Sequence, residues 1–347
     1  MVSTQAVGGY GELEAAEEWF RRQGLPWFVD AVDDRVRELL GRRRLWALLA
    51  GVAVVAAAAG WCAWATLEDA PSAGLVAVVV AIGLLLAYAG GPLRVSIMAR
   101  WAARRVLAEL DLLLPLVSRA LPLLLLFMTF LFINTEVWQV ASTLPRSSLY
   151  ATVLLFSVLG VSFLLTKLPE EVRRVQQAAA GEGLVQACRG TPVEQVARTL
   201  ADARAGVPAP DGDEPLSPTQ RANLLLVLLV TQAFQVLFLA LAVFVFFVCF
   251  GLLAITPAVI RAWIGHPPTA IRWDWGIVQL HLPVSSELYQ VSVFLSAFAG
   301  LYFTVYAVSD AGYREQFFGE LSHGLEQALG VREVYRTLAR DGSSARE

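Results

Sequence analysis

Lysine is almost missing from this chain, since Lys167 is the single lysine among 27 basic residues. Charged residues of both signs are also scarce, at 16% of 347 residues, whereas 56% are hydrophobic and the mean hydropathy is +0.57. Soluble globular domains carry about 25% charged residues, so the composition excludes that class and indicates a membrane protein. The net charge of −3 favours no particular partner beyond the lipid bilayer, and we expect no nucleic acid.

Residues that carry catalysis or bind metals are few. The chain has three histidines, and their spacing matches no ligand pattern. The topology that the arginines indicate places His266 and His281 outside and His323 inside, so they cannot share one site. No Walker A, dinucleotide-binding, G-x-S-x-G or H-E-x-x-H motif occurs, and no span contains a pair of acidic residues. We therefore expect no enzyme activity, no metal and no cofactor.

The three cysteines, Cys62, Cys188 and Cys249, show no C-x-x-C spacing. Cys62 and Cys249 are expected at similar depth near the outer leaflet, which leaves a disulfide between them open. The alternative, which we favour, is that all three are small buried packing residues.

Long apolar runs predict an all-α membrane protein with six spans. About 20 apolar residues in a helix cross a hydrocarbon core about 30 Å thick. The first run begins at Leu45, after a charged segment too long for a signal peptide, so we expect it to be a retained anchor. The predicted spans are residues 45–66, 74–91, 120–141, 149–165, 228–255 and 288–308.

The arginines predict the orientation of these spans. If the first 44 residues are cytoplasmic, only Arg146, Arg261 and Arg272 fall outside, and the other basic residues obey the positive-inside rule. Both termini are then cytoplasmic in a bacterial inner membrane. Six tryptophans map near the outer interface, as in an aromatic belt: Trp61, Trp64, Trp138, Trp263, Trp273 and Trp275.

The segments outside the spans read as amphipathic helices packed under the bundle. Two capping signatures, Thr191 to Glu194 and Ser217 to Gln220, predict the starts of a short helix and of the fifth span. The predicted division is cytoplasmic helices at 1–44, a four-span half at 45–165, a helical loop and linker at 166–221, a two-span half at 222–308 with an external loop at 256–287, and an amphipathic helix and tail at 309–347.

The third span carries the first group of polar residues, Asn134, Glu136 and Gln139. A span that starts after Arg119 places them in the outer quarter of the membrane, which we favour, whereas a start at Leu112 leaves Glu136 in the outer loop. Glu136 could concentrate cations at an external mouth. Alternatively it is a solvated interfacial carboxylate or an ion-pair partner of an outer arginine, an interpretation that is at least as well supported.

Two further groups lie in the fifth and sixth spans, where polar residues face the bundle interior. Thr231, Gln232 and Gln235 are expected to form hydrogen bonds across helices rather than to line a water path. A second group recurs every four residues and forms a stripe of small side chains that favours close helix packing over a pore lining: Ser292, Ser296, Gly300 and Thr304. Ala77 and Ala81 make a similar run in the second span.

Three sequence runs carry a resemblance to a group of proteins: residues 121–140 (LPLLLLFMTFLFINTEVWQV), 231–238 (TQAFQVLF) and 312–318 (GYREQFF). They are similar to those of uncharacterised integral membrane proteins of high-GC actinobacteria, over most of the chain from Gly24 onward. The resemblance implies no activity and no functional residues.

These observations favour a homo-oligomeric channel or transporter that passes a small ion or solute along the third, fifth and sixth spans. The alternative is a non-transporting scaffold or signalling protein that binds a cytoplasmic protein partner through its terminal helices. Voltage-sensing arginine repeats, a T-V-G-Y-G filter and a clear inverted repeat are all absent from the sequence.

Overall fold

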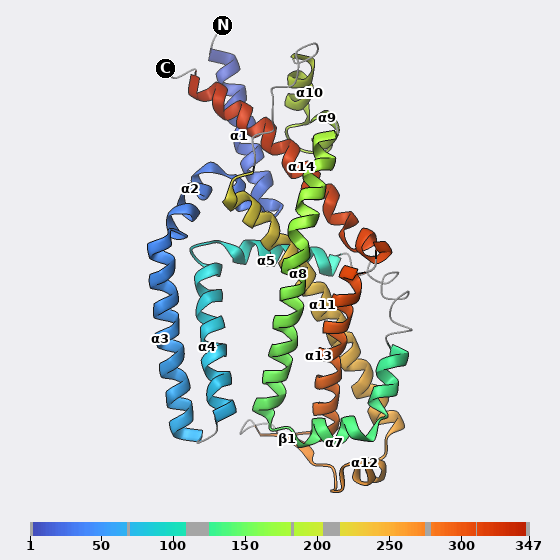
Figure 1. The fold of residues 1–347 in the computed structure, drawn as a ribbon. Coiled ribbons are helices and arrows are strands. Elements are labelled where there is room, and N and C mark those ends of the chain that lie inside the picture. Colours follow the sequence, from blue (N-terminus) through green and yellow to red (C-terminus); the bar gives the residue numbers. More distant parts are fainter. Residues whose placement is uncertain are drawn as a thin grey trace.

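The computed structural model describes residues 3–67, 70–108, 125–181, 184–203, 216–274, 279–309 and 311–344. Nearly all of this part is helical (Figure 1). Five helices are long and apolar enough to cross a membrane, and a sixth span is reached if one bent helix pair counts as a span. The predicted all-α class is therefore confirmed, with several helices long and apolar enough to span a membrane.

The five continuous helices each contain one of the predicted apolar runs. Two of them are much longer than a bilayer requires, because 36 and 37 residues extend about 54 and 55 Å at 1.5 Å per residue, against a core of about 30 Å. The helices are α3 (Arg42–Leu67), α4 (Ala70–Gly90), α8 (Arg146–Gly181), α11 (Pro218–Ala254) and α13 (Ser286–Ser309).

The third predicted span is not one straight helix. A helix over Leu125–Phe132 is followed by α7 (Thr135–Thr143), and the two are bent by 73°. The Asn134 side chain accepts a hydrogen bond from the Glu136 backbone N–H at 2.8 Å and so caps α7 as a new helix. The competing registers at Leu112 and Arg119 lie outside the described residues.

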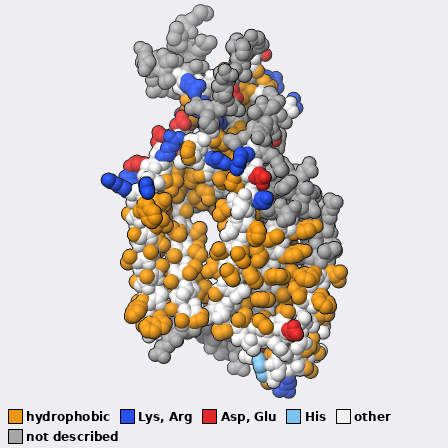
Figure 2. All heavy atoms as spheres, viewed as in Figure 1, with side chains coloured by type: hydrophobic (Ala, Val, Ile, Leu, Met, Phe, Trp, Pro, Cys, Tyr) orange, Lys and Arg blue, Asp and Glu red, His pale blue; other side chains and the backbone are white. Residues whose placement is uncertain are grey.

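Helix α13 lies at the centre of the bundle. Of its most apolar window, 56% of residues are buried, against 6% for α4 and 17% for α3. Helices α7, α8 and α11 pack around it, whereas α3 and α4 form a hairpin at one side (Figure 1). The hairpin closes tightly, since a Cβ on Gly60 would lie 3.0 Å from that of Ala77. Figure 2 shows apolar side chains over the outside of the bundle and an opening beside this hairpin.

Both termini lie at one end of the molecule, where helices from distant parts of the chain form what we call the terminal layer (Figure 1). Its core includes Phe20, whose ring centroid lies 5.3 Å from that of Phe28 and 5.9 Å from that of Tyr335. The structure thus has helices at this end of the bundle, whereas their predicted cytoplasmic location stays a prediction. The layer contains α1 (Ser3–Arg22), η1 (Pro26–Phe28), α2 (Asp30–Leu39), α5 (Val95–Ala108), α9 (Leu184–Ala187), α10 (Glu194–Ala203) and α14 (Ala311–Ser344).

The opposite end, which we call the strand end, is built from α7 and from the predicted external loop at 256–287. This loop is more ordered than predicted. It contains α12 (Pro257–Ile264) and an antiparallel hairpin of β1 (Ala270–Asp274) and β2 (Gln279–Ser285). Helix α12 ends at Ile264 and is capped by Gly265, whose φ of +83° a residue with a side chain would rarely adopt.

Candidate functional site

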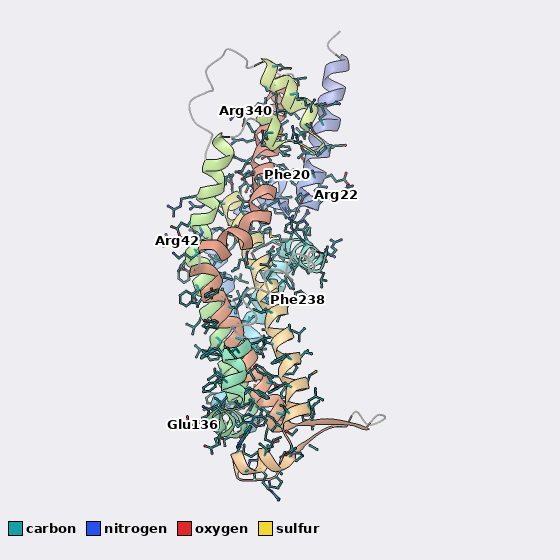
Figure 3. The ribbon with its side chains drawn as sticks, turned by 90° about the vertical axis from the view of Figure 1, so that its right-hand side faces the viewer. Phe20, Arg22, Arg42, Glu136, Phe238 and Arg340 are labelled. Carbon is teal, nitrogen blue, oxygen red and sulfur yellow. The ribbon has the colours of Figure 1, made fainter. Side chains whose placement is uncertain are left out.

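The first polar group lies at the strand end, around the corner between the third-span helix and α7. Glu136 is exposed there, far from the terminal layer that contains Phe20 (Figure 3). Gln139 donates a hydrogen bond from Nε2 to the Trp263 carbonyl oxygen at 3.0 Å and ties α7 to α12. Within the described residues, no ion pair joins Glu136 to an arginine. Glu136 is an exposed carboxylate at the strand end.

The second group lies on α11 and behaves differently from the prediction. Thr231 and Gln232 are buried, and the Thr231 hydroxyl donates to the Val227 carbonyl oxygen of its own helix at 2.8 Å. Neither amide atom of Gln232 has a hydrogen-bond partner, and neither does Oε1 of Gln235. The expected hydrogen bonds across helices are therefore not formed by Gln232. Such an unpartnered buried group costs about 1–3 kcal/mol.

The third group packs, as predicted, between helices. Ser292, Ser296 and Thr304 are buried on α13. A Cβ on Gly300 would lie 3.4 Å from that of Ala240 on α11, and one on Gly160 of α8 would lie 3.7 Å from Oγ1 of Thr304. The stripe thus allows close approach of α13 to two neighbours at once.

Hydroxyl groups of this stripe mostly bond within their own helix. Ser296 donates to the Val293 carbonyl oxygen at 2.9 Å, and Thr304 donates to that of Gly300 at 2.8 Å. Ser292 is the exception, because its buried Oγ has no partner. The second and third groups thus lie on α11 and α13, two helices that pack against each other, whereas the first group lies at the strand end.

A denser polar network lies where α11 enters the terminal layer. The Asn223 side chain accepts a hydrogen bond from the Trp27 backbone N–H at 2.9 Å and donates one to the Gly24 carbonyl oxygen at 3.3 Å. The Trp27 indole donates to the Leu93 carbonyl oxygen at 2.8 Å. Asn223 was not singled out from the sequence, although a buried asparagine in the first turns of an apolar helix is a signal for such a contact.

The start of α11 holds a second buried group, the carboxylate of Asp33. Arg37 pairs with it at 2.6 Å and the Thr219 hydroxyl donates to it. The predicted cap is confirmed, since the Ser217 hydroxyl accepts from the Gln220 backbone N–H and the Gln220 side chain accepts from the Ser217 backbone N–H. An acidic side chain is stabilised at a helix N-terminus, so these contacts fix α2 on α11.

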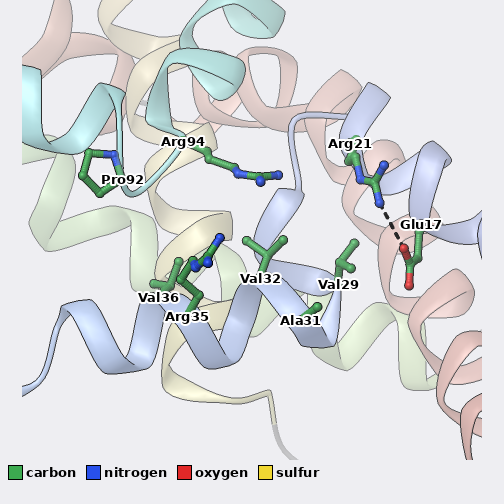
Figure 4. Close-up of a pocket in the computed structure, with 9 residues that line it drawn as sticks. All are labelled: Glu17, Arg21, Val29, Ala31, Val32, Arg35, Val36, Pro92 and Arg94. Carbon is green, nitrogen blue, oxygen red and sulfur yellow. Dashed lines mark hydrogen bonds and ion pairs between the residues drawn. The ribbon is translucent and has the colours of Figure 1, made fainter.

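Two adjoining hollows at the edge of the terminal layer, which share Arg21, form what we call the arginine pocket. The smaller one has a volume of about 220 Å³ and lies between α1, α2 and the turn after α4; Figure 4 shows Arg35 and Arg94 pointing into it from opposite walls. The larger one has about 690 Å³ and lies between α1 and α5. From their positions in the sequence, these arginines indicated only the topology of the spans.

Burial and hydrogen bonding shift several ionisable groups of the terminal layer. Burial raises the pKa of the Cys188 thiol to about 12, with the nearby Glu333 and Glu194 adding to the effect. Burial also raises the pKa of Asp30. The pKa of Glu194 is lowered, because its carboxylate accepts a hydrogen bond from the Gly190 backbone N–H and pairs with Arg198.

The described part of the chain contains neither a metal-binding cluster nor a disulfide bond. No group of three or more histidine, cysteine or acidic side chains could hold a metal ion there. Cys62, Cys188 and Cys249 are all free thiols, and Cys188 alone is buried, so the packing role predicted for Cys62 and Cys249 is wrong. The side chains of His281 and His323 lie outside the described set.

Comparison of the chain with protein-family models, curated proteins and solved structures finds no match. The resemblance to actinobacterial membrane proteins therefore stays a prediction.

Proposed function

We propose that this chain is a non-transporting membrane protein that organises partners through its terminal layer. One observation carries the proposal: α8 and α11 run on beyond bilayer length and join helices from both ends of the chain in one packed layer. A partner that binds the terminal layer would therefore contact helices that continue directly into two spans.

Contacts across the layer support this coupling. Tyr335 on α14 donates a hydrogen bond to Glu17 on α1 at 3.2 Å. Arg332, one turn earlier, donates to the Gln220 side chain of α11 at 3.0 Å. Helix α14 is thus hydrogen-bonded both to the amino-terminal helix and to the start of a span. A movement of α11 would therefore displace α14 and the outer surface of the layer.

The intramembrane polar residues support the same reading from the opposite direction. Ser296, Gly300 and Thr304 are occupied in contacts between helices or in bonds within their own helix, as small residues in membrane bundles usually are. In this proposal they hold the bundle together. The layer faces the cytoplasm of a bacterial cell, and the assembly is a homo-oligomer.

Transport of a small ion or solute is the second candidate, and the unpartnered groups favour it. Gln232 and Ser292 are completely buried and make no hydrogen bond. Polar groups left open in the middle of a membrane protein can bind a polar solute or a water chain. A path between subunits of an oligomer would place these groups next to it.

Reconstitution of the purified chain in planar bilayers under a salt gradient separates the two candidates. We expect no conductance above that of protein-free membranes. Discrete openings that change with Ser292→Ala, while Thr143→Ala at the strand end leaves them unchanged, would replace our proposal with the channel.

Site-specific photocrosslinking in cells tests the positive side of the proposal. Crosslinkers at the exposed Glu14 and Asp202 should each capture a discrete protein, and the two adducts should contain the same partner. A crosslinker at Thr143 serves as the matched control at the strand end. Absence of a common adduct at both layer positions would contradict the proposal.

A further inference from the structure

We propose that the arginine pocket binds the phosphate of an anionic phospholipid headgroup. Such binding is compatible with either candidate function. Three features support it: the charge of the pocket, its position just beyond the end of a span, and the backbone conformation of Arg94.

The pocket has a large excess of positive charge. Two acidic residues, Glu17 and Glu18, face six basic residues across its two hollows: Arg21, Arg22, Arg35, Arg94, Arg104 and Arg105. Both glutamates are already paired, at 3.0 Å with Arg21 in the case of Glu17 and with Arg22 in the case of Glu18. Within the described residues, no carboxylate pairs with Arg35 or Arg94. Two guanidinium groups therefore remain for an external anion.

Arg35 and Arg94 come from different elements, and both line the smaller hollow (Figure 4). The planar guanidinium group matches the geometry of phosphate oxygens and forms two parallel hydrogen bonds with them. Two such groups on opposite walls can hold one phosphate between them. Val29, Val32 and Pro92 line the rest of the smaller hollow with apolar surface, which suits the glycerol and upper acyl region of a lipid.

The pocket lies just beyond the end of a span, at the level where lipid headgroups are expected. Helix α4 ends at Gly90, and the pocket begins at Pro92, two residues beyond the apolar span. Helix α5 then lies across the end of the bundle with Met98 and Ala102 buried and Arg104 exposed (Figure 1). A basic amphipathic helix at this position is typical of the membrane interface. Basic pockets at the ends of spans are known as sites for anionic headgroups.

Arg94 adopts a backbone conformation that few side chains tolerate. Its φ is +57°, and it is the one residue other than glycine with a positive φ among those described. Residues with a Cβ are disfavoured there, so the position would suit glycine or asparagine better. Strained backbone of this kind often occurs at binding sites. Here the strained turn directs a guanidinium group into the pocket.

Titration of the full chain in detergent with single lipids tests the proposal, with native mass spectrometry as the readout of bound lipid. Phosphatidylglycerol is compared with phosphatidylcholine of the same acyl chains and with soluble glycerol phosphate. The double variant Arg35→Gln with Arg94→Asn should weaken phosphatidylglycerol binding about tenfold or more. The control variant Arg146→Gln with Arg261→Gln removes equal charge at the strand end and should leave binding unchanged.

Several results would overturn the proposal. Equal binding of both lipids, or equal loss in both variants, would mean that no specific anion site exists. Binding of glycerol phosphate as tight as that of the lipid would assign the pocket to a soluble phosphate ester. The melting temperature in lipid-free detergent separates these from misfolding, because relief of the strained turn should leave the pocket variant at least as stable as the parent chain.

Discussion

Asn223 and Gln232 lie nine residues apart on the same helix, α11, and both are completely buried, yet their surroundings differ. Asn223 sits in the terminal layer, where its amide both donates and accepts hydrogen bonds to backbone groups of residues 24–27. Gln232 sits in the apolar bundle and makes no hydrogen bond. Hydrogen bonds of buried polar groups therefore hold the terminal layer together, whereas close packing of small residues holds the bundle together.

The largest expected effect breaks the layer side of this comparison. Asn223→Leu keeps the side-chain size but leaves the Trp27 N–H buried without an acceptor, so we expect it to lower the free energy of unfolding by about 3 kcal/mol. Thermal unfolding of the purified chain measures this. A loss below about 1 kcal/mol would show that the contact is not a main support of the layer.

Packing provides a second contrast between the two regions. Gly330 lies on α14, and a Cβ there would come within 2.8 Å of that of Ala187, whereas Gly83 on α4 has nothing within 4 Å. Gly330→Ala should therefore destabilise the chain by about 1–3 kcal/mol through overpacking. Gly83→Ala is the matched control and should cost nothing, because alanine is a better helix former. Equal melting temperatures for the two variants would contradict the close contact of α14 with α9.

The bundle side of the first comparison should respond with the opposite sign. Gln232→Leu removes an unpartnered amide, and we expect it to raise the free energy of unfolding by about 1 kcal/mol. The same thermal measurement applies. A clear loss of stability would show that Gln232 has a partner in the assembled protein, such as a neighbouring subunit or a bound solute, and would favour the transport candidate.

Arg94 sharpens the comparison at the boundary of the two regions. Arg94→Asn places a residue that tolerates positive φ in the strained turn, and we expect a gain of about 1 kcal/mol in lipid-free detergent. Arg104→Asn on α5 is the control without positive φ and should give no gain. If Arg94→Asn lowers the melting temperature without lipid, the side chain stabilises the fold and its strain has another explanation.

The smallest expected effect concerns Cys188 and pH. Its folded pKa of about 12 lies above the ordinary value of 9.0, so the contribution of this group to stability is complete below pH 9 and is lost as the pH rises toward 12. The thiol should therefore react slowly with alkylating reagents at pH 8 unless the chain is unfolded. Mass spectrometry of the alkylated peptide measures the rate, and Cys188→Ser provides the blank. Rapid labelling of the folded chain would show that the layer opens at α9.

Much of the fold could be predicted from the sequence. Five of six predicted spans correspond to long helices, because a run of about 20 apolar residues has few alternatives in lipid. The Ser217 cap and the packing stripe on α13 were also predictable, since both follow from local spacing. The bend before α7 was missed, because one capping side chain, Asn134, outweighed the apolar pattern around it.

The candidate sites were less predictable. The sequence identified Glu136 and Gln139 as polar residues near the end of a span. In the structure they lie at the strand end, away from the other two polar groups. The arginine pocket required residues from α1, α2 and the turn after α4 to meet. The spacing of these residues along the chain does not predict that they share a pocket.

By itself the sequence determined that this protein is helical and that several of its helices are long and apolar enough to cross a membrane, because hydrocarbon imposes length and composition on any helix that crosses it. The tertiary structure decided which buried polar groups are bonded and which are not, and which arginines share a pocket. Those outcomes depend on contacts between residues as far apart as Trp27 and Asn223, which only the packing of distant helices brings together.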